Sequence, residues 1–252
     1  MLEVTALQLQ RGNNFALDIR HWQALPGEVH AILGTNGAGK STLLKLLSGE
    51  EASPGNVLLH HTPLQSWPSM ERARHLGVLP QSNNLSFAFS AEEVVSLGLT
   101  PLTLGWRQGR QTVHAMMRAT NCAHLGKAKY PALSGGEQQR VHLARVLVQL
   151  SQAEREPVLL LDEPTSAQDL GQQHRLMELA GELARSQHFC IVAILHDLNL
   201  ALRYADHCML LDQGQAVAVG TPNEVVNGVN IERYWGYSAQ VLTSECGRTV
   251  IS

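Results

Sequence analysis

The sequence predicts an α/β fold, with a mainly parallel sheet lobe, a helical lobe inserted into it and a short C-terminal tail. Short apolar runs alternate with helical stretches along the chain, the order typical of a parallel sheet flanked by helices. Three runs are continuously apolar, as expected of strands buried on both faces: Val29–Leu33, Val158–Leu161 and Cys190–Leu195. The stretch 83–150, which lies between the first two runs, has a mostly helical pattern instead.

The domain organisation follows from this alternation. We expect a single domain over residues 1–252. Residues 1–82 and 151–225 would form the sheet lobe, residues 83–150 the helical lobe and residues 226–252 the tail.

The helical lobe carries clear boundary signals. Ser90 followed by Glu93 is a capping box, which predicts a helix through Leu97 that Gly98 ends. A longer helix is expected from near Ser134 through Val148. In the tail, a hairpin is expected from two short runs on either side of a polar turn, Val241–Ser244 and Arg248–Ile251.

Composition narrows the class of protein. The net charge of −3 offers no electrostatic footprint for a nucleic-acid backbone, so we expect no nucleic-acid partner. The N-terminal stretch lacks the basic and apolar regions of a signal peptide, and the longest apolar runs are far short of the ~20 residues that span a bilayer. The four cysteines show no CxxC spacing, which favours reduced thiols in a cytoplasmic protein. We therefore expect a soluble chain that reaches any membrane through a partner.

A phosphate-binding loop follows the first apolar run. The pattern GxxxxGK[ST], set between a strand and a helix, occupies nine residues: Gly34, Thr35, Asn36, Gly37, Ala38, Gly39, Lys40, Ser41 and Thr42. Its glycines let backbone N–H groups turn toward phosphate oxygens, and the helix N-terminus adds its positive dipole end. Lys40 would neutralise the β- and γ-phosphates, and the Ser41 hydroxyl would bind Mg²⁺. The alternative, an ordinary glycine-rich turn with a surface lysine, does not explain this strand-and-helix context.

A pair of carboxylates follows the second apolar run. Val158–Leu161 leads directly into Asp162 and Glu163, and ligand chemistry in open α/β sheets lies at the carboxyl ends of strands. Asp162 would hold the magnesium ion, and Glu163 would act as the general base that polarises the attacking water. Solvated acids in a loop are the alternative for an Asp-Glu pair, but the phosphate-binding loop makes it unattractive.

A second anion site is indicated at the start of the long helix. Ser134, Gly135 and Gly136 would present a hydroxyl and unpaired N–H groups at a helix N-terminus. Because they belong to the other lobe, a nucleotide clamped between two copies of the chain is one reason for two phosphate sites. On its own, this tripeptide would be interpreted as a capped helix start.

The octet LSGGEQQR at residues 133–140 resembles the signature motif of the ABC ATPases, and the family's other motifs follow in order. Gln81 resembles the Q-loop glutamine, residues 166–169 the D-loop and His196 the switch histidine. The resemblance covers essentially the full chain and implies a P-loop NTPase of the ABC cassette type that binds ATP and Mg²⁺. It further implies that Gln81 contacts Mg²⁺ and the attacking water, that Asp169 touches the opposite subunit and that His196 binds the γ-phosphate.

Two positions depart from the family pattern. Arg11 stands where an aromatic residue usually stacks on adenine, which leaves the base contact open, although an arginine can also stack on a base. In the D-loop, Gln168 stands where a leucine is usual.

Two stretches, residues 77–81 and 87–95, are most similar to the ATPase subunits of importers for haem, ferric siderophores and cobalamin. The resemblance implies a homodimer below two transmembrane permease subunits, fed by a periplasmic binding protein, on the cytoplasmic face of the bacterial inner membrane. Haem is the first choice of cargo. Ser82–Leu99, with Leu85, Phe87 and Phe89, is expected to dock the permease, whereas lobe core is the alternative for the two phenylalanines.

Other functions were weighed against this one. A soluble ABC ATPase acting on nucleic acid would carry a long coiled coil or a second cassette, and a P-loop kinase or GTPase would lack Ser134–Gly136 and His196. The twelve histidines share no motif, so haem ligation by this chain is not expected, and His60-His61 is expected in a solvated turn.

Overall fold

The computed structural model describes residues 1–252 except 12–14, 53–54, 82–87, 167 and 244–248. The side chains of residues 11, 15 and 16 are also not described. The helices are α1 Lys40–Ser48, α2 Ser69–His75, α3 Ala91–Ser96, α4 Trp106–Ala119, α5 Gly135–Leu150, α6 Leu170–Gln187, α7 Leu198–Tyr204, α8 Pro222–Val225 and α9 Gly228–Trp235. Short 3-10 turns lie at Leu64–Ser66, Leu97–Leu99, Ala123–Leu125 and Tyr130–Ala132.

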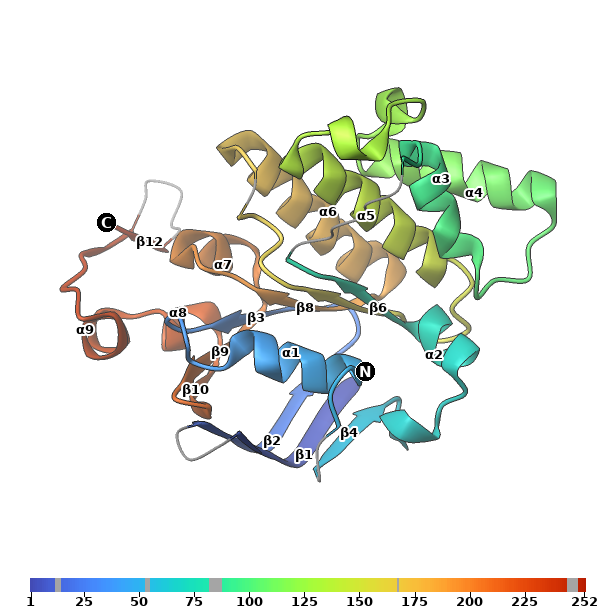
Figure 1. Ribbon diagram of the computed structural model, residues 1–252. Helices are drawn as coiled ribbons and strands as arrows, with labels where there is room; N and C mark the ends of the chain where they lie inside the picture. The colour runs from blue at the N-terminus through green and yellow to red at the C-terminus, as the bar shows by residue number, and fades with distance from the viewer. Residues whose placement is uncertain (12–14, 53–54, 82–87, 167, 244–248) are drawn as a thin grey trace.

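One large sheet organises the chain (Figure 1). Its strands are β1 Leu2–Arg11, β2 Phe15–Ala24, β3 Val29–Leu33, β4 Asn56–Leu59, β5 Thr62–Pro63, β6 Leu76–Leu79, β7 Val158–Leu161, β8 Cys190–Ile194, β9 His207–Asp212 and β10 Gln215–Gly220. They pair in the order β5-β4-β1-β2-β10-β9-β3-β8-β7-β6. A separate antiparallel pair, β11 Val241–Thr243 and β12 Thr249–Ile251, forms the hairpin expected in the tail.

The two halves of the sheet run differently. The five strands β9, β3, β8, β7 and β6 pair in parallel with one another, as the buried apolar runs predict. In the other half, β1 pairs antiparallel with both β2 and β4, and β9 pairs antiparallel with β10. The prediction of a mainly parallel sheet therefore describes the half whose strands are buried on both faces, while the hairpins add an antiparallel half.

Helices cover both faces of the parallel half. In Figure 1, α5 and α6 lie above β6, β8 and β3, whereas α1 lies below them, on the side of β1, β2 and β4. Adjacent residues of one strand accordingly enter different cores: Ala31 and Leu33 pack with α5 and α6, and Ile32 packs with α1. Helices on both faces bury the central strands completely. Because these strands are parallel, their carboxyl ends lie at one edge of the sheet.

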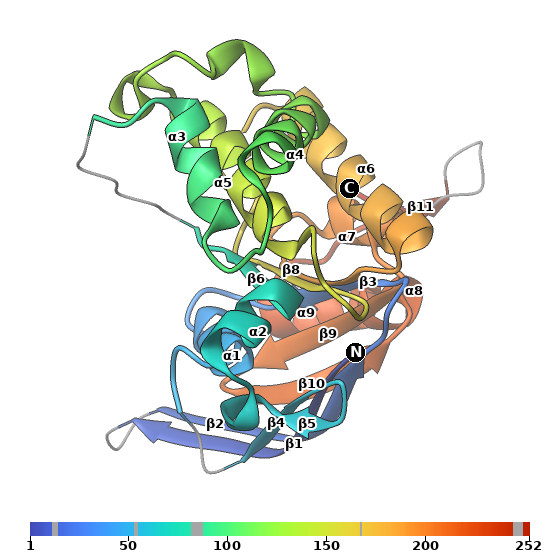
Figure 2. The same cartoon turned by 90° about the vertical axis from the view of Figure 1, so that its right-hand side faces the viewer.

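A third buried cluster joins α3, α4 and α5, which Figure 2 shows grouped on one side of the sheet. Val94, Val113 and Val141 belong to it, while Val146 and Leu150 of α5 pack on the sheet. The predicted capping boxes are present, because Ser90 caps α3 with Glu93 and Ser134 caps α5 with Glu137.

Gly98 has a different role from the predicted helix stop. The chain continues through it in the 3-10 turn Leu97–Leu99. A Cβ at Gly98 would lie 2.2 Å from the carbonyl oxygen of Arg145, so glycine is required there for close packing against α5.

The predicted solvated turn at His60-His61 is correct for His61 and wrong for His60, which is buried. Both residues form a turn with φ of 50° and 62°, but His60 is only 9% exposed. Its ring packs beside Trp67 and His75, and burial lowers its pKa to about 4. His61 is exposed, as expected. Among the described helices, none is long and apolar enough to cross a membrane.

Candidate nucleotide-binding site

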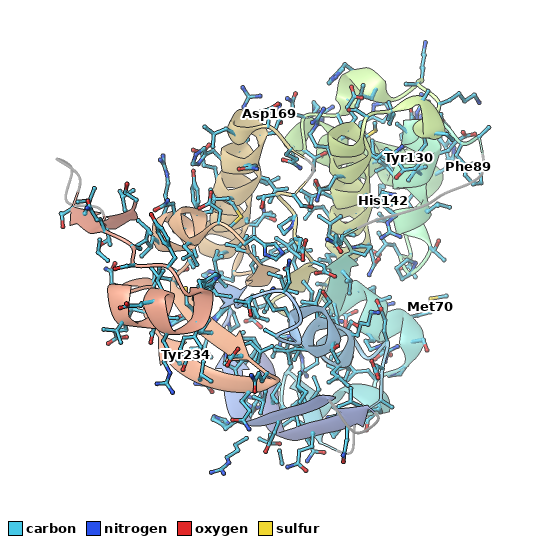
Figure 3. The ribbon with its side chains drawn as sticks, turned by 60° about the vertical axis from the view of Figure 1, so that its left-hand side comes forward. Met70, Phe89, Tyr130, His142, Asp169 and Tyr234 are labelled. Carbon is cyan, nitrogen blue, oxygen red and sulfur yellow. The ribbon has the colours of Figure 1, made fainter. Side chains whose placement is uncertain are left out.

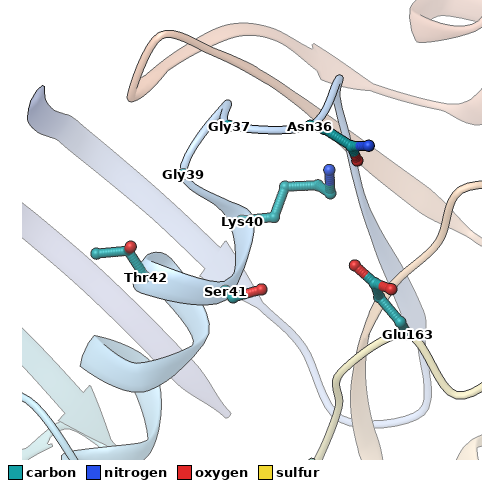
Figure 4. A pocket seen from close by; sticks show the side chains of 7 residues that line it. All are labelled: Asn36, Gly37, Gly39, Lys40, Ser41, Thr42 and Glu163. Atoms are coloured by element: carbon teal, nitrogen blue, oxygen red, sulfur yellow. The ribbon is translucent and has the colours of Figure 1, made fainter. Parts of the chain in front are cut away.

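The phosphate-binding loop connects the end of β3 to the start of α1 (Figure 4). Gly34, Gly37 and Gly39 have φ of 146°, 82° and 106°, the left-handed region that favours glycine. At Gly34 the reason is also steric, because a Cβ would lie 2.2 Å from the carbonyl oxygen of Leu211 in β9. The glycine pattern thus turns the chain sharply from the strand into the helix.

The turn between β9 and β10 holds the phosphate-binding loop through a backbone hydrogen bond. Gly214 donates its N–H to the carbonyl oxygen of Ala38 at 2.9 Å. The same residue accepts from the N–H of Asp18 in β2, also at 2.9 Å. One residue therefore joins the phosphate-binding loop, the β9–β10 turn and the antiparallel half of the sheet. Gly214 was not among the residues predicted for the site, although Gln213-Gly214 is a turn pattern between two apolar runs.

Lys40 is held by its own loop. Its Nζ donates to the carbonyl oxygens of Gly34 at 2.8 Å and Thr35 at 2.9 Å, and the residue is 5% exposed. Burial lowers the pKa of the ammonium, and the nearby carboxylates of Glu163 and Asp162 oppose that shift. The lysine is therefore preorganised as a cation beside the cavity.

A cavity of about 320 Å³ opens in front of the loop. Its lining residues are Asn36, Gly37, Gly39, Lys40, Ser41, Thr42 and Glu163. Figure 4 shows the side chains of Asn36, Lys40 and Glu163 converging on this space, with Ser41 beneath them. Free N–H groups at a helix N-terminus, a buried cation and a facing carboxylate suit a phosphate chain and a water.

Three predicted catalytic side chains meet at the carboxyl ends of adjacent parallel strands. Glu163 follows β7, Gln81 follows β6 and His196 follows β8. Gln81 Nε2 donates to Glu163 Oε2 at 2.5 Å, and His196 Nε2 lies 2.6 Å from Glu163 Oε1. Glu163 has a φ of 47°, unusual for a residue with a side chain, and is 15% exposed. Each carboxylate oxygen is thus fixed by one neighbour.

Asp162 and Ser41 form an oxygen-donor pair beside this group. Ser41 Oγ lies 3.5 Å from Asp162 Oδ1, and the Asp162 N–H donates to Leu79 of β6 at 2.9 Å. Burial, followed by the nearby carboxylate of Glu163, raises the pKa of Asp162. A hydroxyl and a poorly solvated carboxylate are suitable ligands for Mg²⁺, which usually takes few protein ligands and completes its shell with phosphate and water. Among the described residues, no cluster of three or more His, Cys, Asp or Glu side chains forms.

The Ser134–Gly136 helix start does not line that cavity. Ser134 Oγ and N–H both donate to Glu137 Oε2, at 2.7 Å and 2.8 Å, and the Glu137 N–H donates back to Ser134 Oγ. These hydrogen bonds, that from the Ser134 hydroxyl first, lower the pKa of Glu137. Ser134 and Gly135 are exposed, so this second helix N-terminus faces outward from the chain.

Asp169 is also exposed and also caps a helix. Its carboxylate accepts from the Gln172 N–H at 2.9 Å at the start of α6, where Figure 3 shows it at the outer end of the helix. Ala167, in the same predicted D-loop, lies outside the described residues.

Parts of two predictions lie outside the described portion of the chain. The side chain of Arg11 is not described, so the base contact stays a prediction. Leu85 and Phe87 of the expected docking segment also lie outside it, while Phe89 is described and 38% exposed.

The glycine loop, the buried lysine and the paired carboxylates at the carboxyl edge of a parallel sheet define a nucleotide-binding site of the P-loop type. A family profile described as ABC transporter matches residues 17–166. The hemin import ATP-binding protein HmuV of Shewanella denitrificans is 47% identical over 251 residues, 97% of each chain. The protein of the same name from Vibrio cholerae is 48% identical over 85% of this chain and 83% of its own.

A solved transporter structure contains a chain with the same fold. A transporter assigned to the metal-chelate type, in an inward-facing conformation, has a chain with a TM-score of 0.82 and 26% identity, over 100% of this chain and 97% of its own. This chain therefore belongs to the ABC transporter family, among its ATP-binding subunits.

Proposed function

We propose that this chain is the ATP-hydrolysing, energy-coupling subunit of a haem importer. It acts as a homodimer on a pair of transmembrane permease subunits, at the cytoplasmic face of the bacterial inner membrane. The observation that carries the chemistry is the convergence of Gln81 and His196 on Glu163, opposite the phosphate-binding loop. The observation that supports haem as the cargo is 47% identity over 97% of the chain with a hemin import ATP-binding protein.

The proposed reaction is attack of water on the γ-phosphorus of ATP, with departure of ADP. N–H groups of residues 34–42 and the Lys40 ammonium hold the phosphates and stabilise the charge on the leaving oxygen. Glu163 orients the water and accepts its proton, while Gln81 and His196 keep the carboxylate in place. Ser41 and Asp162, with Gln81, would hold Mg²⁺, which would neutralise negative charge on the phosphates.

The dimer is supported by the separation of the two helix N-termini. The cavity takes residues from the phosphate-binding loop and Glu163, whereas Ser134 and Gly135 are exposed and are not among its lining residues. In a homodimer, Ser134–Gly136 of one copy can close over the nucleotide of the other. Asp169, exposed at the start of α6, is then available to the opposite subunit.

The membrane partners are proposed from the family relation and from the position of residues 88–99. Phe89 is 38% exposed and stands just ahead of α3, while Gln81 contacts Glu163 at the other end of the intervening segment. A permease docked near Phe89 would sense each cycle of hydrolysis through Gln81. A periplasmic binding protein delivers the cargo to the permease.

Reconstitution with the permease pair tests the proposal. The subunit and permease are placed in proteoliposomes with the binding protein loaded with haem, a ferric siderophore or cobalamin. Haem should stimulate ATP hydrolysis and cross the membrane. If haem does neither while another cargo does both, the cargo is wrong; if no cargo stimulates hydrolysis although the complex is assembled, the coupling role is wrong.

A further inference from the structure

A buried glutamine links the signature helix to the loop that follows the catalytic carboxylate. Gln139 lies in the second turn of α5, five residues after Ser134, and is 7% exposed. Its Oε1 accepts a hydrogen bond from Gln168 Nε2 at 2.9 Å. Gln168 is the residue that stands where the family usually has a leucine, so the departure noted in the sequence has a defined contact.

The contact continues toward Glu163. Gln173 Nε2 donates to the carbonyl oxygens of Gln168 and Thr165, both at 3.1 Å. Thr165 is 7% exposed and lies two residues after Glu163. The Ser166 N–H in turn donates to the carbonyl oxygen of Glu163 at 3.2 Å. Hydrogen bonds therefore run from the body of α5 to the backbone of the residue that carries the general base.

The pair would not be replaced by apolar packing. A leucine at position 168 has no donor, so it would leave the buried Oε1 of Gln139 unpaired. Gln139 Nε2 is itself buried without a hydrogen-bond partner in the described structure. A rotated Gln139 amide could donate from that nitrogen, so position 168 can hold either a donor or an acceptor.

We propose that Gln168 and Gln139 are positioning residues that fix the signature helix relative to the catalytic loop of the same chain. The proposal rests on the composite dimer site proposed above. Ser134 then acts on the nucleotide of the opposite copy, while Glu163 acts on its own. The hydrogen bond between the two glutamines ties α5 to Gln168, so a shift of α5 that kept this bond would also move Gln168.

Turnover by the homodimer tests the proposal with three variants. Gln168→Leu should lower kcat about fivefold, the equivalent of the ~1 kcal/mol of one neutral hydrogen bond, with ATP affinity unchanged. Gln168→Glu should restore kcat to within about twofold of the unsubstituted protein, because the rotated Gln139 amide donates to the new carboxylate. The matched control is Gln172→Leu, since no hydrogen bond of the Gln172 side chain is described and its backbone N–H keeps the Asp169 cap.

A double substitution tests whether the two glutamines act through one shared interaction. Gln139→Leu combined with Gln168→Leu should cost no more kcat than the worse single change, because both remove one interaction. An unchanged kcat in Gln168→Leu, or a Gln168→Glu that stays as slow as Gln168→Leu, would overturn the proposal. Equal losses in kcat and ATP affinity, together with a lower melting temperature, would assign the pair a purely structural role and also overturn it.

Failure of the positioning role can be distinguished from failure of the function proposed above. Loss of turnover in Glu163→Gln tests the active site in a background where the glutamine pair is intact. If that variant is inactive while Gln168→Leu turns over at the unsubstituted rate, only the positioning role fails.

Discussion

Two helix N-termini of this chain are proposed to bind phosphate, and they differ in what occupies their first turn. Helix α1 starts behind Gly39, which has a φ of 106° and offers no side-chain cap, and its first turn contains no acidic residue. Helix α5 starts behind Ser134, whose hydroxyl and N–H are both engaged by Glu137. The first N-terminus is open beside a buried lysine, and the second is closed by its own carboxylate.

Because of this difference, the N-terminus of α1 can bind phosphate within one chain, whereas that of α5 is proposed to contact the nucleotide of a second copy. The open end at α1 leaves its N–H donors to the ligand, so it can hold phosphate within one chain. At the closed end of α5, the capping box already engages the Ser134 hydroxyl and the N–H groups of Ser134 and Glu137, which stabilises the helix start within one chain. Under the proposed function, a partner's phosphate takes the place of Glu137 at Ser134 only when two copies meet.

The largest expected effect is at the open end. Glu163→Gln removes the general base and leaves the loop and Lys40 intact, so turnover should fall about a thousandfold or more while ATP still binds. The ATP-bound dimer should then accumulate, which size-exclusion chromatography with ATP and Mg²⁺ can measure. Near-normal hydrolysis by this variant would remove Glu163 from the catalytic role.

Mixing two inactive variants tests whether the closed end works in the partner. Lys40→Ala destroys the α1 site and keeps Ser134, whereas Ser134→Arg blocks the α5 site and keeps Lys40. Each should be inactive alone. A mixed dimer regains one complete site, so roughly a quarter of the original activity should return at equal proportions of the two chains, by random pairing. A mixed dimer confirmed by two affinity tags that shows no activity would contradict the composite site.

The stability of α5 against acid is the next expected effect. His142 is 2% exposed and lies 2.7 Å from Tyr130 Oη, as Figure 3 places them, and burial lowers its pKa from 6.5 to about 4. The unfolded chain therefore binds a proton at a pH where the folded chain does not. The contribution of His142 to stability should be complete above about pH 6.5 and fall by about 2–3 kcal/mol as the pH drops toward 4.

Denaturant unfolding at several pH values measures this effect. His142→Gln should show a shallower loss of stability over that pH range than the unsubstituted protein. His61→Gln, at an exposed histidine, should follow the unsubstituted curve. Identical pH dependence in all three proteins would mean that His142 is not a source of acid sensitivity.

The smallest expected effect is on the cap itself. Glu137→Ala opens the α5 N-terminus and should cost about 1 kcal/mol, which lowers the melting temperature by roughly 2–4 °C in a chain of this size. Glu93→Ala breaks the equivalent capping box of α3 and serves as the control. Both should retain ATP binding at α1. If only Glu137→Ala changes turnover, the closed end has a role beyond helix stability.

The sequence predicted three strands of the parallel half, β3, β7 and β8, because burial on both faces leaves an apolar run, whereas β6 and β9 were not predicted. Val29–Leu33 and Val158–Leu161 match β3 and β7 residue for residue, and Cys190–Leu195 exceeds β8 by one. The antiparallel half was not predicted, because one exposed face gives β1 and β2 a weaker, alternating pattern. The bounds of the two lobes remain a proposal.

Predictions at the site varied with how local the signal was. The loop at residues 34–42 and the cap at Ser134 depend on neighbouring residues, so their geometry could be expected. The meeting of Gln81, Glu163 and His196 depends on strand order, and only the family resemblance pointed to it. His60 was misjudged because burial by Trp67 and His75 involves residues farther along the chain.

Gly214 connects the two places where a nucleotide is expected to be held. Its N–H donates to the phosphate-binding loop and its carbonyl oxygen accepts from β2, so these two hydrogen bonds tie the loop to the antiparallel half of the sheet. The base contact is expected from that half, at the end of β1 next to β2. A nucleotide that contacted both would therefore span two parts of the chain that Gly214 already joins.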